Sequence, residues 1–167
     1  SSFVAWCWKA GGAAVSNTSG SITSSVSANQ EGGFSVVTWT GTNGTGTIGH
    51  GLGKAPQWIV IRRRDSDSSW VVYHEGIGNT KRVILDENYD ASSASANWFN
   101  NTSPTSTTFS VGSDGGSNGS TDGYVAWCWS EIPGFSKFGK YFGNGSSDGV
   151  YVHLGFRPAW IMVKRTS

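Results

Sequence analysis

Charged residues and long apolar runs are both scarce in this chain of 167 residues. Lys, Arg, Asp and Glu together make up 14% of the sequence and nearly cancel, leaving a formal net charge of +1. Such a balance provides no basic surface for nucleic acid, so we expect no nucleic-acid partner. No apolar run approaches the roughly 20 residues of a membrane-spanning helix, so we expect no membrane insertion.

Cysteines and catalytic patterns are scarce as well. Cys7 and Cys128 are too few for a disulfide-rich scaffold, and neither belongs to a CxxC pair. The sequence contains no GxSxG, HExxH or phosphate-binding loop. Its three histidines stand far apart, and its carboxylates are scattered. We therefore expect a protein that is not an enzyme and uses no cofactor.

Glycine, tryptophan and short β-type runs are abundant instead, with 24 Gly and nine Trp. Runs rich in β-branched and aromatic residues lie at 34–41, 57–64, 69–75, 81–86, 106–112, 124–130, 149–155 and 159–165. Gly- and Asn-rich stretches that favour tight turns separate them, and no segment shows a capped helical period. The pattern predicts an all-β fold, an antiparallel β-sandwich or jelly-roll-like module with essentially no helix.

One unusual string occurs twice, as "FVAWCWK" at 3–9 and "YVAWCWS" at 124–130. Other elements recur in the same order: "GGFS" at 32–35 and "PGFS" at 133–136, "NG" at 43–44 and 144–145, "LGKAPQWIVIRR" at 52–63 and "LGFRPAWIMVKR" at 154–165. Two explanations are open, a window on a tandem array or a single domain with a duplicated strand pair.

The tandem-array explanation divides the chain into three parts. Residues 1–33 are then the last strand of a preceding unit followed by a Ser/Gly-rich linker. Residues 34–130 are the central β module, and residues 131–167 are the first strands of a following unit. The array predicts that residues 34–61 and 135–163 fold as the same strand–turn–strand unit.

The repeated "AWCW" string predicts a central strand. Alternation puts Tyr124, Ala126 and Cys128 on one face and Val125, Trp127 and Trp129 on the other. Small residues opposite large ones suit a strand that is packed on both faces, with cysteine as a small apolar residue. We expect both thiols to be unpaired and to bind no metal. The Trp stripe is either core or an exposed platform for sugar rings.

Signals for ion and ligand sites are faint. "DENYD" spaces Asp86, Asn88 and Asp90 like the start of a calcium loop, but Ala91 and Asn97 stand where that loop needs Gly and Glu. A solvated turn is therefore the favoured explanation.

Two Gly-rich turns are the candidate ligand-contact loops. They are the turn around His50 and the loop 113–123, which contains Asp114, Asn118 and Asp122. Glycine there would let a ligand approach the backbone closely.

Several strings taken together resemble a repeated module of marine bacteriophage proteins that are tail-fibre-like or other virion structural components. They include "GHGLGKAPQWIVIRRR", "WVVYH", "NNTSPTSTTFSVGSDGGSNGS" and "GFSKFGKYFGNGSSDGVYVHLGFRPAWIMVKRTS". The resemblance covers nearly the whole chain. It implies a β-rich repeating architecture and a place on the virion surface, as part of a tail fibre or capsid decoration. It assigns no catalytic or ligand-binding residue.

Two classes of function are therefore open. The first is a virion structural module that contacts other virion proteins and copies of itself, as a homo-oligomer such as a trimer, and contributes to attachment to host-surface glycans. The second is a carbohydrate-binding module, a carbohydrate-active enzyme or a secreted bacterial adhesin. The scarcity of charge and of catalytic clusters favours the first. A carboxylate pair that faces one groove would favour the second.

Overall fold

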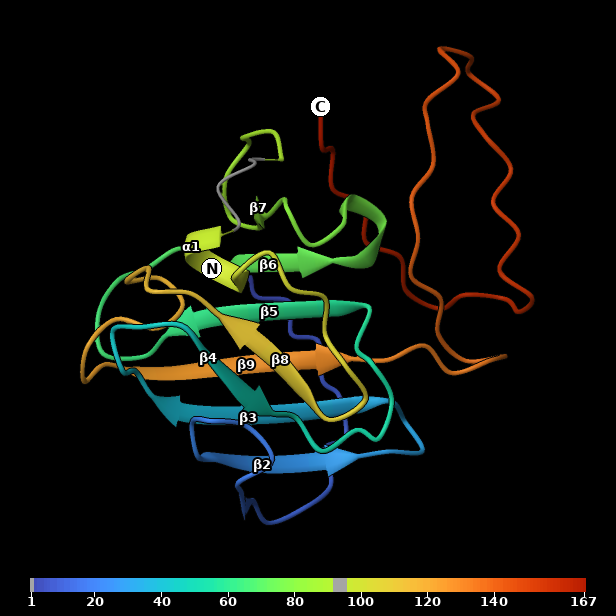
Figure 1. Cartoon of the computed structure of the whole chain (residues 1–167). Helices are drawn as coiled ribbons and strands as arrows, with labels where there is room; N and C mark the ends of the chain where they lie inside the picture. Colours follow the sequence, from blue (N-terminus) through green and yellow to red (C-terminus); the bar gives the residue numbers. More distant parts are fainter. Residues whose placement is uncertain (1, 92–95) are drawn as a thin grey trace.

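The computed structural model describes residues 2–91 and 96–167, and its regular structure is almost entirely β. The large antiparallel sheet has the strand order β1-β2-β3-β9-β5-β6-β7, and β4 pairs with β8 in a small second sheet (Figure 1). The strands of the large sheet are β1 (Val15–Asn17), β2 (Ser24–Asn29), β3 (Phe34–Thr40), β5 (Trp58–Arg63), β6 (Val71–His74), β7 (Val83–Ile84) and β9 (Gly123–Trp129). The small sheet contains β4 (Gly46–Gly49) and β8 (Thr108–Val111).

Helix contributes very little to the described part of the chain. It consists of the 3-10 turn η1 (Glu75–Ile77) and the single turn α1 (Ala96–Phe99). Neither has the length or apolar character needed to cross a membrane. The prediction of an all-β fold with antiparallel, layered sheets is confirmed.

The strand that contains the repeated string, β9, lies at the centre of the large sheet. It pairs with β3 on one side and with β5 on the other, although both precede it by many residues in the sequence. Trp129 is the common point of the register, because it faces Phe34 on β3 and Trp58 on β5. Sheet formation therefore depends on contacts between distant segments of the chain.

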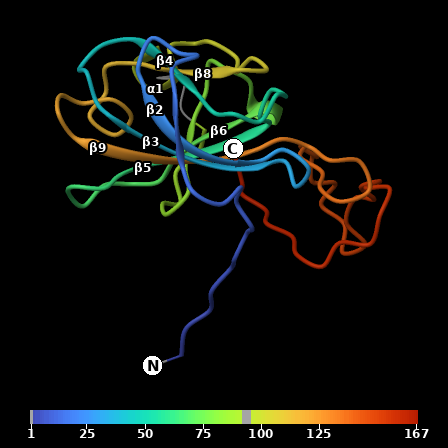
Figure 2. The same cartoon turned by 90° about the horizontal axis from the view of Figure 1, so that it is seen from below.

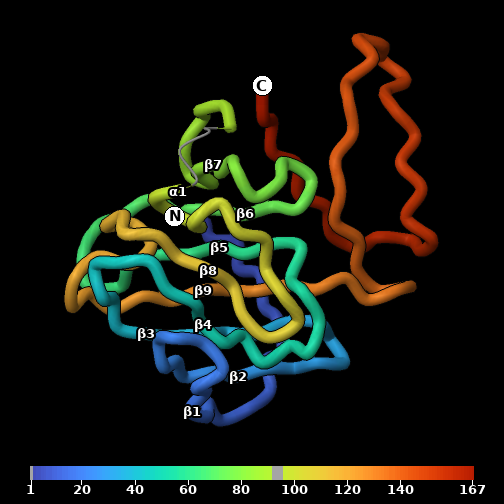
Figure 3. The backbone as a smooth tube through the Cα atoms, viewed as in Figure 1, coloured from blue at the N-terminus to red at the C-terminus, as the bar shows by residue number. Residues whose placement is uncertain are grey.

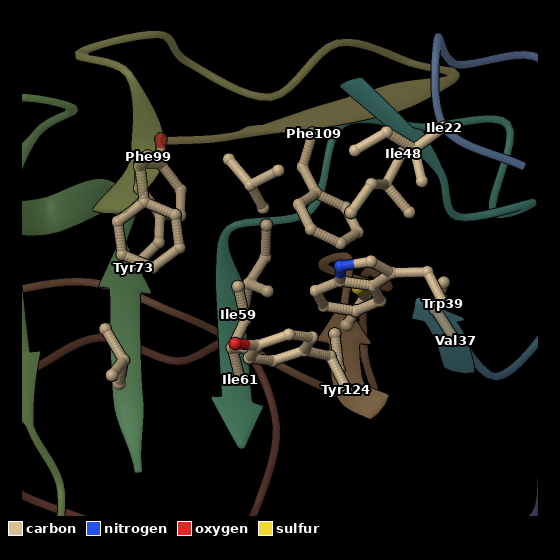
Figure 4. Close-up of a cluster of buried hydrophobic side chains, with 14 of the residues drawn as sticks. Ile22, Val37, Trp39, Ile48, Ile59, Ile61, Tyr73, Phe99, Phe109 and Tyr124 are labelled. Carbon is tan, nitrogen blue, oxygen red and sulfur yellow. The ribbon is translucent and has the colours of Figure 1, made fainter. Parts of the chain in front are cut away.

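The main hydrophobic core lies between the two sheets, which form separate layers in the edge view (Figure 2). Trp39 and Tyr124 extend from the large sheet toward Phe109 on β8, and Ile59 and Ile61 lie beside them (Figure 4). The rings of Trp39 and Tyr124 stack with their centroids 5.4 Å apart.

The inward face of β9 consists of the residues that alternation predicted. Tyr124, Ala126 and Cys128 are all completely buried in this core. The interpretation of Cys128 as a small apolar packing residue is confirmed.

The opposite face of the large sheet carries a second apolar cluster. Its buried members are Phe34, Trp58, Val60, Val72, Val83 and Trp129. The central strands therefore bury side chains on both faces, which explains the nearly continuous apolar sequence of "WIVI" in β5 and "AWCW" in β9. Strand β2, by contrast, alternates Ser24 and Val26 toward the core with Ser25 and Ser27 toward the other face.

Six of the eight predicted strands are present, with shorter bounds at most ends. They are β3, β5, β6, β7, β8 and β9. Strands β1, β2 and β4 were not predicted, and residues 15–17 and 24–29 belong to the sheet where a linker was expected. The Ser- and Gly-rich composition has low intrinsic strand propensity, and pairing with β3 and β8 stabilises these strands instead.

The strands predicted at 149–155 and 159–165 are not formed, and neither is one at 3–9. After β9 the chain leaves the sheet, makes a long excursion and returns beside β6 and β7 (Figure 3). The expectation that residues 135–163 fold like residues 34–61 is therefore wrong for this structure. The physical reason is that β3 and β5 do not pair with each other, because β9 lies between them and pairs with both. No strand of the described chain lies between the corresponding residues of segment 135–163, so they have no partner with which to form a sheet.

Candidate interaction surface

A row of aromatic rings crosses the outer face of the large sheet at one end of its central strands. Trp58 and Trp129 lie directly opposite each other on β5 and β9, and their rings stack with centroids 4.1 Å apart. Phe34 continues the row on β3, 5.1 Å from Trp129. Directly opposed aromatic side chains on neighbouring strands stabilise a sheet, and these three are buried.

Aromatic residues from both ends of the chain extend this row outward. Trp8 packs edge-on against Trp129 at 5.5 Å and against Trp160 at 5.6 Å. Trp6 also contacts Trp160, at 6.1 Å, and Phe138 contacts Trp58, also at 6.1 Å. We call this set the aromatic junction; its members are Trp6, Trp8, Phe34, Trp58, Trp129, Phe138 and Trp160.

Exposure rises outward through the aromatic junction. Trp129 is 8% exposed, whereas Trp8 and Trp160 are each 39% exposed and Trp6 is 59% exposed. Indole rings bury large areas when they are covered, so the outer members leave apolar surface in contact with water. The junction is a built hydrophobic surface whose inner half is packed and whose outer half is open.

The neighbouring part of the same face does not form an open sugar platform. Trp70 and Trp127 stack on each other with centroids 5.1 Å apart and planes inclined by 12°, and the Arg62 guanidinium lies 5.0 Å from the centre of the Trp70 ring. These contacts cover ring faces that an open sugar platform would expose. Part of the predicted Trp stripe, Trp129 in particular, is core, as the packing alternative required.

His50 does not lie at an accessible turn, contrary to the prediction. Its side chain is completely buried. Its Nε2 atom donates to the Thr105 carbonyl at 3.2 Å, and its Nδ1 atom accepts from the Leu52 N–H at 3.2 Å. Burial lowers the pKa of His50, and the bond to Thr105 opposes this only in part. The ring is a neutral structural link between two loops, so a ligand cannot reach it.

Asn118 in the loop 113–123 is also fully buried. Its amide nitrogen donates to the Thr42 hydroxyl at 3.0 Å and to the Gly44 carbonyl at 2.6 Å, and its oxygen accepts from the Thr42 N–H. The side chain joins this loop to the turn that follows β3. The Gly-rich sequence predicted a loop that contacts a ligand, whereas in the structure this loop holds the turn after β3 in place.

Asp114 and Asp122 serve the same loop. Asp114 accepts from the Gly116 N–H at 2.8 Å, and Asp122 forms an ion pair with Arg63 at 2.6 Å. Both carboxylates are partly covered. Each carboxylate therefore has at least one oxygen that already binds a partner within the fold.

Two of the three weak calcium candidates, Asn88 and Asp90, line an open depression that also contains two cations. Asp86 accepts from the Trp70 N–H at 2.8 Å, which gives it a structural role. The depression is lined by Asn88 and Asp90 together with Lys164 and Arg165, and the Arg165 guanidinium lies 4.0 Å from Asp90. Two positive side chains beside the carboxylate disfavour a bound cation. Within residues 2–91 and 96–167, no group of three or more His, Cys, Asp or Glu is placed to hold a metal ion.

The two cysteines have opposite environments although their sequence contexts match. Cys128 is a buried free thiol, and burial raises its pKa. Cys7 is an exposed free thiol. The same local sequence is therefore a core strand in one place and a solvent-exposed segment in the other.

These features define a class: an all-β module with one aromatic surface that is only half covered. The chain matches, over residues 1–167, the family model of a domain of unknown function, DUF7483, and it belongs to that family. No curated protein and no solved structure matches the chain.

Proposed function

We propose that the chain is a non-enzymatic structural module of a bacteriophage particle, part of a tail fibre or another surface appendage, that assembles with further copies of itself. One observation carries the assembly role. The exposed large apolar side chains are concentrated in residues 3–8 and 135–163, outside the layered body. A concentration of exposed large apolar side chains of this kind is typical of protein–protein contact sites.

The polar residues of the predicted contact loops support a structural role. His50 and Asn118 are buried and hydrogen-bonded, and Asp122 is paired with Arg63. His50 links the loop after β4 to the loop before β8, Asn118 links the loop 113–123 to the turn after β3, and Asp122 ties the same loop to β5. A rigid body with internally satisfied loops suits a repeated building unit better than it suits a site that must rearrange around a substrate.

The virion location rests on the resemblance of the repeated strings to phage tail-fibre-like and virion structural proteins. Its test is to purify particles of the phage that encodes the chain, to search them for its peptides by mass spectrometry, and to label them with a gold-conjugated antibody raised against the module. We expect the peptides in intact particles and the gold on a tail or capsid appendage. Particles without the peptides would overturn the virion role.

Attachment to host-surface glycans is the second candidate function, and the exposed indoles of Trp6, Trp8 and Trp160 favour it. An isolated module should then bind weakly, while many copies on one particle raise avidity by about 10²–10⁴ through tethering. A glycan array with monomeric module and an adsorption assay with whole particles test this together. Nanomolar binding by the monomer, or hydrolysis of a sugar, would favour a carbohydrate-active protein instead.

A further inference from the structure

Residues 3–8 have the sequence of a core strand but not its environment. "VAWCW" at 4–8 is identical to residues 125–129 of β9, and Phe3 stands where β9 has Tyr124. Tyr124 is completely buried, whereas Phe3 is 91% exposed. The segment has no regular structure, and it extends away from the body (Figure 2).

The C-terminal part of the chain carries copies of the two strands that pair with β9. "FS" at 135–136 repeats the start of β3, and "WIMVKR" at 160–165 repeats the "WIVIRR" of β5. Ile59 in β5 is completely buried, and its counterpart Ile161 is 68% exposed. These segments therefore have the sequence that accepts a β9-type strand, and their apolar side chains are uncovered.

We propose that residues 3–8 of one copy insert as a β-strand between residues 135–138 and 160–165 of a second copy. The register of β9 with β5 then transfers directly. Trp58 opposite Trp129 becomes Trp160 opposite Trp8, and Ile59 opposite Cys128 becomes Ile161 opposite Cys7. On the other side, the register of β3 with β9 places Phe135 opposite Trp8.

The aromatic junction shows the first contact of this pairing. Trp8 and Trp160 already touch within one chain, at 5.6 Å, but edge-on and without the stacking that Trp58 and Trp129 reach at 4.1 Å. Trp6 also contacts Trp160, whereas the transferred register would place Trp6 opposite Met162. The two segments of one chain therefore meet at a point and form no ladder.

Anchors on both segments explain why a second copy is the better partner. The Lys9 carbonyl accepts from the Asn29 side chain at 3.1 Å, which fixes the end of the N-terminal segment beside β2. The end of the C-terminal segment is fixed beside residues 87–91, where the Ala91 N–H donates to the Thr166 carbonyl at 3.1 Å. Residues 3–8 of another molecule have no such tether to the acceptor.

Strand insertion between copies has a structural consequence. Donor and acceptor are different surfaces of the module, so the contact is heterologous, and a pair of copies keeps one free acceptor on the first and one free donor on the second. Repetition of such a contact generates a ring where the rotation between copies closes and an open-ended filament where it does not. A second copy as the partner extends the proposed assembly role, and this pairing does not depend on the virion location.

Association of the full chain provides the first test. Ala5→Pro removes a backbone N–H from the exposed donor segment, and Val163→Pro does the same in the exposed acceptor. Ser2→Pro, outside the copied string, is the matched control. Analytical ultracentrifugation over a range of concentrations should show self-association of the wild type and of the control. Each of the other two variants should raise the dissociation constant by about tenfold or more.

A thiol test fixes the register and separates pairing between chains from pairing within one. Wild-type chain, which supplies Cys7, is mixed with the double variant Cys7→Ser, Ile161→Cys and oxidised with diamide. Opposed residues on paired strands have Cβ atoms about 4.5–5.5 Å apart, and a disulfide needs about 3.5–4.5 Å, so a small shift of the strands lets Cys7 and position 161 form a disulfide between the two chains. Met162→Cys in place of Ile161→Cys is the control, because its side chain points to the other face.

Several outcomes overturn the proposal. They are a wild-type chain that stays monomeric at all concentrations, association that Ala5→Pro leaves unchanged, and crosslinking that is equal at positions 161 and 162. In the single variant Ile161→Cys, a disulfide only within one chain would assign the donor strand to its own acceptor and would also refute it. If the strand pairing holds while the particles lack the protein, the virion role fails and this inference stands. If the particles contain the protein and the strand pairing is absent, the virion role stands and this inference fails.

Discussion

The hydroxyl group of Tyr124 offers a sharp test of how the loop 113–123 is held. The hydroxyl donates to the Gly115 carbonyl at 2.6 Å and accepts from the Gly119 N–H at 2.8 Å. Tyr124→Phe removes one oxygen atom and keeps the ring stacked on Trp39. The change therefore isolates the two hydrogen bonds from the packing of the core.

The expected loss in the free energy of unfolding differs between the two hydrogen-bond partners of the hydroxyl, the Gly119 N–H and the Gly115 carbonyl. Gly119 is buried, so its N–H finds no water after the substitution, whereas Gly115 is exposed and its carbonyl can be hydrated. An orphaned buried polar group costs about 1–3 kcal/mol, and a bond that water replaces costs little. We expect a decrease of about 2 kcal/mol in the free energy of unfolding. For a domain of this size that lowers the Tm by about 4–8 °C.

Urea unfolding followed by tryptophan fluorescence measures this loss, with Tyr151→Phe as the matched control. The Tyr151 side chain is exposed and has only a 3.4 Å contact with His153, so its variant should be as stable as the wild type. A decrease below about 0.5 kcal/mol for Tyr124→Phe would mean that the loop rearranges freely, and the assignment of loop 113–123 as a rigid structural element would then be wrong.

Three further changes test other parts of the structure. Cys128→Ser buries a hydroxyl in the core and should cost about 1–3 kcal/mol, while Cys7→Ser should cost nothing; an Ellman assay of native protein should titrate one thiol, and two equal rates would contradict the burial of Cys128. Burial lowers the pKa values of His50 and His74 below 6.5, so the unfolded chain binds more protons in acid; the free energy of unfolding should be fully retained above about pH 6.5 and should fall as the pH drops below it, and a flat profile from pH 7.5 to 5 would refute this. Gly33→Ala should destabilise by more than about 1 kcal/mol in thermal melts, because φ is +62° there and a Cβ atom would collide with the backbone of the loop after β9; an unchanged Tm would show that this turn adjusts.

Local sequence predicted the central strands correctly because their side chains are apolar on both faces. "FSVVTWT", "WIVIRR" and "YVAWCW" have the β-branched and aromatic content that a doubly covered strand needs. Alternation along β9 also identified its inward face, with Tyr124, Ala126 and Cys128 buried as expected. By contrast, β2 and β4 have few such residues, and pairing decided their structure.

At the candidate site, local sequence does not distinguish ligand-binding residues from structural ones. Polar residues in Gly-rich loops, such as His50 and Asn118, have the same local sequence signal whether they face a ligand or another loop. Only the fold, which brings residues 42–44 to Asn118 and Thr105 to His50, showed that they are structural. The aromatic junction was visible in the sequence only as repeated strings.

The residue pattern alone specifies the class of fold and the segments that are able to form the central strands. Tertiary structure decided which copy of each segment becomes a strand. "VAWCW" is a buried strand at 125–129, where β3 and β5 supply backbone partners on both sides, and an exposed segment at 4–8, where no strand pairs with it. The physical reason is that a strand satisfies its N–H and C=O groups on its neighbours, and those neighbours lie far away in the sequence.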